Sequence, residues 1–265
     1  MTRGLPRALV AYSCLILLYL PCLAVAAFSV NKARFGLNWK GFTLMWYQKL
    51  FENEIIFEAA VNSLILAAIS TVIATVIGTA LALGLERTAW PKNALRLFET
   101  VVNIPVVIPD IIMAVALVFA FSFLKRLSSV FELGMGALII AHVTFQISFV
   151  TLVVRGRLAS LNPETREAAI DLFASRIYHF RRVTFPLILP GVMTGAMLAF
   201  TLSLDDFIIS FFIHGPESVT LPIYIFSSLK RGLTPETNAL STVISLFTVI
   251  LALLAERLTR VKANS

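Results

Sequence analysis

Charged side chains are scarce in this sequence. Asp, Glu, Lys and Arg make up 14% of its 265 residues, against about 25% in an average soluble domain. Hydrophobic residues make up 58% and gather in long runs, so water cannot be the only solvent for the chain. The net charge of +7 does not favour a nucleic-acid partner, because the basic residues lie between the apolar runs and form no single patch.

Cysteine and histidine are also rare, which limits the chemistry expected of the chain. Cys14 and Cys22 lie in one apolar run and form no metal-ligand spacing with the three scattered histidines. There is no phosphate-binding loop, no H-E-x-x-H motif and no G-x-S-x-G motif. We therefore expect no catalytic residues, metal site or cofactor in this chain. If its function uses ATP, a separate subunit hydrolyses it.

Six apolar segments are long enough to cross a bilayer, which requires about 20 residues. They cover approximately residues 8–29, 57–84, 98–124, 134–154, 186–213 and 237–255. These segments predict an all-α polytopic membrane protein with six transmembrane helices. We expect one domain over residues 1–265, because no connection is long enough to hold a soluble domain.

The first segment also has features of a signal peptide, since Arg3 and Arg7 precede an apolar run that ends in small residues. A lipoprotein cleavage site before Cys22 is a second alternative, but Pro21 fits poorly where a small residue is needed. The run is about 20 residues long, more than the usual core of a signal peptide. We therefore expect an uncleaved first helix.

The distribution of lysine and arginine predicts the orientation in the membrane. With the N-terminus inside, 14 of the 22 basic residues fall in cytoplasmic stretches, and cytoplasmic loops are normally enriched in them. Both termini are therefore expected in the cytoplasm. The longest cytoplasmic connection is then residues 155–185.

This connection contains the signature of a short capped helix. Asn162 is a suitable N-cap, Pro163 suits the first helical position, and Glu164 suits the first turn. Two interpretations stay open from the residues alone. The helix lies on the membrane, held to anionic lipid by its arginines, or it docks on a cytoplasmic partner through small alanines and Glu167.

Asp110 is an ionisable residue inside the third apolar segment, where charge costs about 2.5–3.5 kcal/mol on insertion scales. On a straight helix it would lie about 18 Å from the cytoplasmic end, near the middle of the bilayer. Pro105 and Pro109 precede it and predict a break in the helix.

Asp205 and Asp206 are adjacent near the outer end of the fifth segment, and Ser203 lies close enough to hydrogen-bond nearby. Neighbouring helical residues point about 100° apart, so one carboxylate can face a pathway while the other pairs with a helix. These carboxylates are buried links between helices, a proton or cation relay of a secondary transporter, or a path for a cationic substrate.

Other polar and small residues favour helix packing. His142 and Gln146 share one helical face and are expected to make hydrogen bonds between helices. Gly191 and Gly195 form a G-x-x-x-G pattern that permits close helix approach. Trp46 lies in an outside connection, where it belongs to an interfacial aromatic belt or offers a cation–π surface.

The cytoplasmic connection resembles the E-A-A loop of binding-protein-dependent ABC importer permeases, whose pattern is E-A-A-x3-G-x9-I-x-L-P. Glu167, Ala168 and Ala169 match its start, and residues 183–186 match its end with mild changes. Phe173 replaces the glycine, which leaves the local bend of the loop open. The resemblance implies a type I ABC importer permease architecture, in which these four residues couple the permease to an ATPase subunit.

A second stretch is similar to spermidine/putrescine importer permeases. It contains S-L-D-D at residues 203–206, L-P-I-Y-I-F-S at 221–227 and G-L-T-P-E-T-N-A-L at 232–240. This similarity implies a polyamine importer in a bacterial inner membrane. Its partners would be a second permease, two cytoplasmic ATPase subunits and a periplasmic binding protein. It also implies roles in polyamine passage for Trp46, Asp110, Glu167, Ser203, Asp205 and Asp206. A permease for another small solute, a self-sufficient cation-coupled transporter and a membrane-embedded enzyme are the alternatives.

Overall fold

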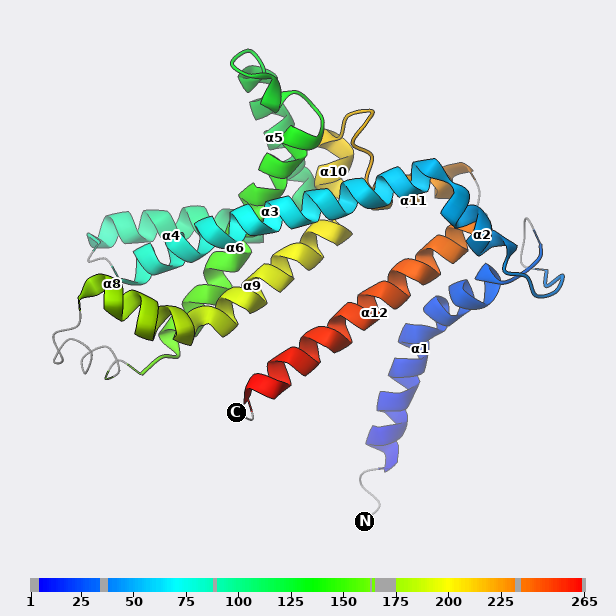
Figure 1. The fold of residues 1–265 in the computed structure, drawn as a ribbon, viewed down its shortest axis with the longest axis horizontal. Helices are drawn as coiled ribbons and strands as arrows, with labels where there is room; N and C mark the ends of the chain where they lie inside the picture. The colour runs from blue at the N-terminus through cyan, green and yellow to red at the C-terminus, as the bar shows by residue number, and fades with distance from the viewer. Residues whose placement is uncertain are drawn as a thin grey trace. The chain divides into compact units, whose positions relative to one another are not determined.

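The protein is helical throughout the described part of the chain, which comprises residues 5–33, 38–87, 90–162, 164, 175–231 and 235–263 of a computed structural model. One isolated antiparallel bridge joins Asn31 and Phe42. The helices, shown in Figure 1, are α1 (Leu5–Ser29), α2 (Met45–Glu52), α3 (Glu54–Arg87), α4 (Lys92–Val107), α5 (Asp110–Leu124), the short 3-10 helix η1 (Ser129–Phe131), α6 (Met135–Ala159), α8 (Arg176–His179), the π-helical turn η2 (Phe180–Thr184), α9 (Phe185–Asp205), α10 (Ile208–Ile213), α11 (Leu221–Arg231) and α12 (Pro235–Ala263). The prediction of an all-α membrane protein is confirmed.

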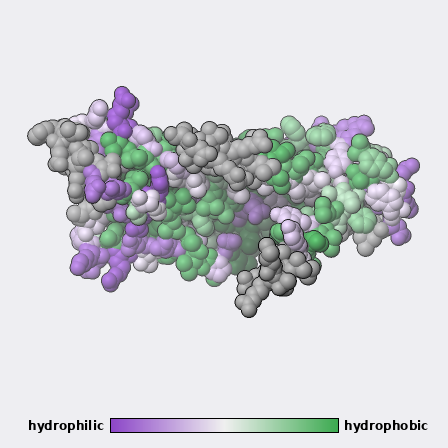
Figure 2. All heavy atoms as spheres, turned by 90° about the horizontal axis from the view of Figure 1, so that it is seen from below, coloured by the Kyte–Doolittle hydropathy of each residue, from purple (hydrophilic) through white to green (hydrophobic). Residues whose placement is uncertain are grey.

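Several helices are long and apolar enough to cross a membrane. Four qualify singly, over Tyr12–Ser29, Glu54–Glu86, Met135–Ala159 and Ile177–Asp205, and the bent pair of α4 and α5 can form a fifth span. Many of their large hydrophobic side chains are exposed, as lipid-facing residues must be, and apolar side chains cover much of the surface in Figure 2. Helix α12 contains the sixth predicted segment but is not among these spans, so the count of six stays a prediction.

The third predicted segment, 98–124, is not one straight helix. It divides into α4 and α5, which meet at 111° across Ile108 and Pro109. Pro109 has no backbone N–H and cannot continue the hydrogen-bond ladder of α4, so the predicted break is confirmed at Pro109, whereas Pro105 lies inside α4. The depth of about 18 Å expected for Asp110 assumed a straight helix. This assumption was wrong, because the segment bends before Asp110.

The fifth predicted segment and the loop before it also have different bounds. Helix α6 continues to Ala159, beyond the predicted start of the connection at residue 155, and α8 begins at Arg176, before its predicted end at residue 185. From Ile177 the helix runs without interruption to Asp205, including the π-helical turn η2. It ends there, because Asp206 is extended, with φ −66° and ψ 120°. Helix α10 begins two residues later.

The helices form two compact units, one of Met1–Phe57 with Tyr224–Ser265 and the other of Glu58–Ile223. In the first unit α12 packs against α1 and α2. The side chain of Asn53 at the end of α2 donates to Glu236 at the start of α12, over 2.9 Å. The prediction of one domain over the whole chain stays a prediction.

In the second unit α6 packs against α4, α5, α9 and α10. Small residues allow the closest approaches. A methyl group built on Gly191 of α9 would lie 2.6 Å from the Arg157 Cβ, and one on Gly78 of α3 would lie 2.8 Å from the Val150 Cβ. Gly195 also faces Val150, at an ordinary 3.5 Å. The close packing predicted from the G-x-x-x-G pattern is therefore confirmed.

Gly191→Ala is expected to destabilise the protein by about 1–3 kcal/mol, because the added methyl group overlaps Arg157 in a packed interface. Gly156→Ala is the matched control. Gly156 is also helical, but no atom lies within 4 Å of the place that its added methyl group would take. Thermal unfolding of the detergent-purified protein should show a lower midpoint for Gly191→Ala alone. Equal midpoints for the two variants would contradict the packing interpretation.

Candidate functional site

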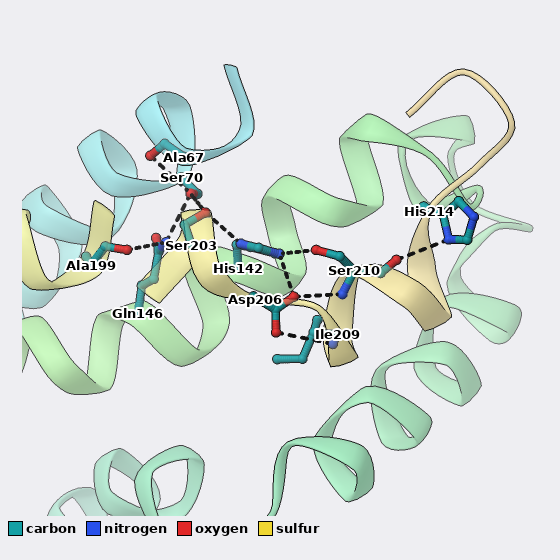
Figure 3. A network of polar contacts seen from close by, with 10 residues as sticks. All are labelled: Ala67, Ser70, His142, Gln146, Ala199, Ser203, Asp206, Ile209, Ser210 and His214. Carbon is teal, nitrogen blue, oxygen red and sulfur yellow. Dashed lines mark hydrogen bonds and ion pairs between the residues drawn. The ribbon is translucent and has the colours of Figure 1, made fainter. Parts of the chain in front are cut away.

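A buried polar cluster occupies the centre of the second unit. It consists of Ser70, His142, Gln146, Ser203, Asp206 and Ser210, contributed by α3, α6, α9, the α9–α10 break and α10 (Figure 3). His142 lies at its middle and is completely buried. Its Nδ1 lies 2.8 Å from the Ser203 hydroxyl, and its Nε2 lies 3.1 Å from the Ser210 hydroxyl and 3.4 Å from Asp206 Oδ2. The imidazole of His142 therefore joins three of these helices, α6, α9 and α10.

Asp206 has a structural place in this cluster. Its Oδ2 accepts the backbone N–H of Ser210 over 2.8 Å, and its Oδ1 accepts that of Ile209 over 3.3 Å. These two bonds satisfy donors at the start of α10 that no carbonyl of that helix can reach. The side chain is only 9% exposed and faces His142. Asp206 thus caps α10 and ties it to α6.

Gln146 extends the cluster by one helical turn. Its amide nitrogen donates to the Ser70 hydroxyl and to the Ala199 carbonyl, both over 3.1 Å. Ser70 in turn lies 3.4 Å from Ser203. The prediction that His142 and Gln146 make hydrogen bonds between helices is confirmed.

Asp205 and Asp110 have a different environment from Asp206. Asp205 is the last residue of α9 and Asp110 the first of α5, and both are exposed. Among the described residues, no ion pair involves either carboxylate. Exposed carboxylates without a cationic partner in their own chain can receive a positive charge from elsewhere.

The two adjacent aspartates therefore differ, although not by helical spacing, because Asp206 lies beyond the end of α9 and is extended. Asp206 pairs with a neighbouring helix, whereas Asp205 points away from the cluster to the surface. Ser203 is nearly fully buried and bonds His142, so its side chain faces the cluster. Whether Asp110, Ser203, Asp205 and Asp206 act in transport stays a prediction.

Trp46 lies in the first unit, buried on α2. Its indole N–H donates to the Asn31 carbonyl over 2.8 Å, and Lys49 Nζ lies 5.2 Å from the centre of its ring. Asn31 also binds the Lys40 N–H and the Asn38 carbonyl through its side chain. The ring therefore packs under a connection of its own unit. A role for Trp46 in substrate passage stays a prediction.

The four coupling residues Glu167, Ala168, Ala169 and Phe173 lie outside the described residues. The residues before them are described. Asn162 Oδ1 accepts the backbone N–H of Glu164 over 3.0 Å, and its Nδ2 donates to Glu164 Oε2 over 3.1 Å. This is the cap that the sequence predicts for Asn162.

Two cluster residues could not be found from the sequence. Ser70 and Ser210 lie in apolar runs that contain several serines and threonines, and no local pattern separates them from the others. Only the packing of α3 and α10 on α6 brings them to Gln146 and His142. Among the described residues, no three side chains of His, Cys, Asp or Glu come together as a metal site.

Asp206→Ala is expected to lower the stability of the protein by about 1–2 kcal/mol, the usual effect of removing a helix cap. Asp206→Asn keeps one oxygen, which can accept one of the two N–H groups at the start of α10, and should retain part of this stability. Glu217→Ala, at an exposed residue of the same unit, is the control. The midpoint of thermal unfolding reports all three. An unchanged midpoint for Asp206→Ala would exclude the capping role.

The long apolar helices, the broken spans and the polar cluster define an integral membrane protein of the transport kind. Residues 74–263 match the family described as binding-protein-dependent transport system inner membrane component. The chain belongs to this family, and it is therefore an inner-membrane permease of the ABC importer type.

Curated relatives resemble the chain over most of its length. The spermidine/putrescine transport system permease protein PotC of Haemophilus influenzae is 38% identical over 92% of both chains. PotC of Escherichia coli strain K12 is 35% identical over 98% of this chain and 94% of its own. The putrescine transport system permease protein PotI of the same strain is 36% identical over 86% of this chain and 81% of its own.

Solved structures agree with the fold. A chain of a bacterial ABC transporter that imports the acidic polysaccharide alginate is 18% identical, with a TM-score of 0.75 and 97% coverage of both chains. A chain of an alginate transporter in complex with its alginate-bound periplasmic protein is 20% identical, with a TM-score of 0.72, over 95% of this chain and 90% of its own. At these identities the comparison establishes the architecture alone, an ABC importer permease fold.

Proposed function

We propose that this permease moves polyamines such as spermidine and putrescine into the cytoplasm by ATP-driven alternating access. The observation that carries the proposal is the identity of 35–38% to spermidine/putrescine permeases over more than nine tenths of the chain. Polyamines are extended chains of protonated amines. The exposed carboxylates of Asp110 and Asp205, without ion-pair partners among the described residues, suit such a cation.

The proposed assembly contains a second permease, two cytoplasmic ATPase subunits and a periplasmic binding protein. The family description names a binding protein, and one structural relative was solved with its periplasmic protein. Both termini would lie in the cytoplasm, as the distribution of lysine and arginine predicts. This chain would carry neither a cofactor nor a catalytic residue, since its sequence lacks a phosphate-binding loop.

Substrate-dependent ATPase activity tests this function. The whole complex is reconstituted in nanodiscs, and the binding protein is added empty, with spermidine, with putrescine or with a neutral sugar. We expect hydrolysis to rise only with a polyamine-loaded binding protein. Stimulation by another solute would support the importer function but would exclude polyamines as the substrate. Uptake by this chain alone from an ion gradient, without an ATPase, would instead favour a cation-coupled transporter.

A further inference from the structure

One buried side chain contacts both sides of the break between α9 and α10. Ser203 precedes this break, Asp206 lies within it, and Ser210 follows it. The imidazole of His142 reaches all three, at 2.8 Å, 3.4 Å and 3.1 Å. No other side chain in Figure 3 is joined by dashed lines to residues on both sides of the break and within it.

The donors and acceptors of this arrangement are consistent with one tautomer. A carboxylate only accepts hydrogen bonds, so Nε2–H is the partner that suits Asp206. The Ser210 hydroxyl oxygen accepts a hydrogen bond from the same Nε2–H group, and its own proton is free to be donated to another acceptor. Nδ1 then accepts from the Ser203 hydroxyl. The ring is fully buried and packs on Phe145, so it has no room to turn away from these partners.

The geometry of the break determines what lies beside Asp205. Asp205 is the last helical residue of α9, and the next residue turns to extended backbone. The torsion angles at Asp206 set the direction in which the chain leaves α9, so a change in them would move α10 relative to Asp205. Asp205 is exposed while Asp206 is held by His142 and by the N–H groups of α10.

We propose that His142 is a positioning residue for cation passage. By joining Ser203, Asp206 and Ser210 it fixes the α9–α10 break, and the fixed break holds α10 in place beside the exposed Asp205 carboxylate that the substrate meets. This inference rests on the proposed function, in which Asp205 receives an organic cation. His142 itself is buried and does not touch the substrate.

Two conservative variants distinguish the roles of the two ring nitrogens of His142. The amide of His142→Gln reaches the place of Nε2 and can still donate toward Asp206, whereas the amide of His142→Asn reaches only the place of Nδ1 and Ser203. We expect His142→Asn to raise the KM of ATP-driven polyamine uptake about tenfold, as displaced binding groups do. His142→Gln should stay close to wild type, and kcat should change less than KM in both.

Thr151→Val is the matched control for a general loss of packing. Thr151 also lies on α6 and is also fully buried, but its hydroxyl donates to the Gly78 and Ile147 carbonyls, which are not part of the cluster. It should lower the amount of assembled permease without raising KM. A KM increase of the same size in Thr151→Val, or equal KM values in both His142 variants, would overturn the proposal.

A second readout does not depend on the substrate. Asp205→Cys is introduced after Cys14→Ser and Cys22→Ser, since both native cysteines are exposed. The reaction rate of the new thiol with a cationic thiol reagent then reports its position. We expect His142→Asn to change this rate several-fold, and His142→Gln and Thr151→Val to leave it unchanged. If wild type takes up no polyamine, the proposed function fails, yet this rate still decides the role of His142. An unchanged rate in His142→Asn would refute it.

Discussion

Asp205→Asn is expected to lower the kcat/KM of polyamine uptake by about tenfold to a hundredfold. A hydrogen bond to a charged group is worth about 1.5–3 kcal/mol, and about 1.4 kcal/mol corresponds to a factor of ten. The effect should appear in transport and not in assembly, because Asp205 is exposed and has no ion-pair partner among the described residues. Radiolabelled uptake into proteoliposomes measures it, with the amount of complex determined in parallel.

Two further variants control this prediction. Asp205→Glu keeps the charge and should retain a large part of the uptake. Glu217→Gln removes another exposed carboxylate of the same unit and should have no effect. If Asp205→Asn transports like wild type, or fails only because the complex no longer assembles, the substrate role of this carboxylate is wrong.

Glu167→Ala is expected to uncouple ATP hydrolysis from uptake. The E-A-A resemblance places Glu167 in the loop that docks on the ATPase subunit, and Glu167 lies in the stretch between α6 and α8. Uptake per ATP hydrolysed should fall about tenfold, within the usual range of coupling energies between sites. Simultaneous measurement of phosphate release and labelled uptake in the same vesicles gives this ratio.

The helix that follows the loop offers a physical route for such coupling. It runs over 29 residues from Ile177 to Asp205, and so connects the chain after the E-A-A loop with the exposed carboxylate of Asp205. Glu164→Ala is the control, since Glu164 is exposed and bonds Asn162 within the loop start. Unchanged coupling in Glu167→Ala would reject the docking role of this residue.

The sequence predicted the helices well where a pattern of local residues determines them. Long apolar runs predicted the spans, Pro109 predicted the break before α5, and Asn162 predicted a helix cap. The bend angle and the depth of Asp110 could not follow from composition, because they depend on how α5 packs against α10 and α6. The break after Asp205 has no proline or glycine, so no local sequence pattern predicted it.

The candidate site was predicted in part for the same reason. Helical spacing predicted different directions for the two adjacent aspartates, whereas in the structure Asp205 is exposed and Asp206 is buried because α9 ends between them. The helical spacing of His142 and Gln146 predicted that both share one buried face. Their partners Ser70, Ser203 and Ser210 come from three separate helices, so only the tertiary packing could identify them.

The central claim is that ATP hydrolysis drives the import of polyamines through this permease. The most direct measurement is uptake of radiolabelled spermidine and putrescine by proteoliposomes that contain the permease pair and ATPase, with the binding protein supplied. We predict saturable uptake that requires ATP and the loaded binding protein. The absence of polyamine uptake, in vesicles whose ATPase responds to the binding protein loaded with a different solute, would contradict the account.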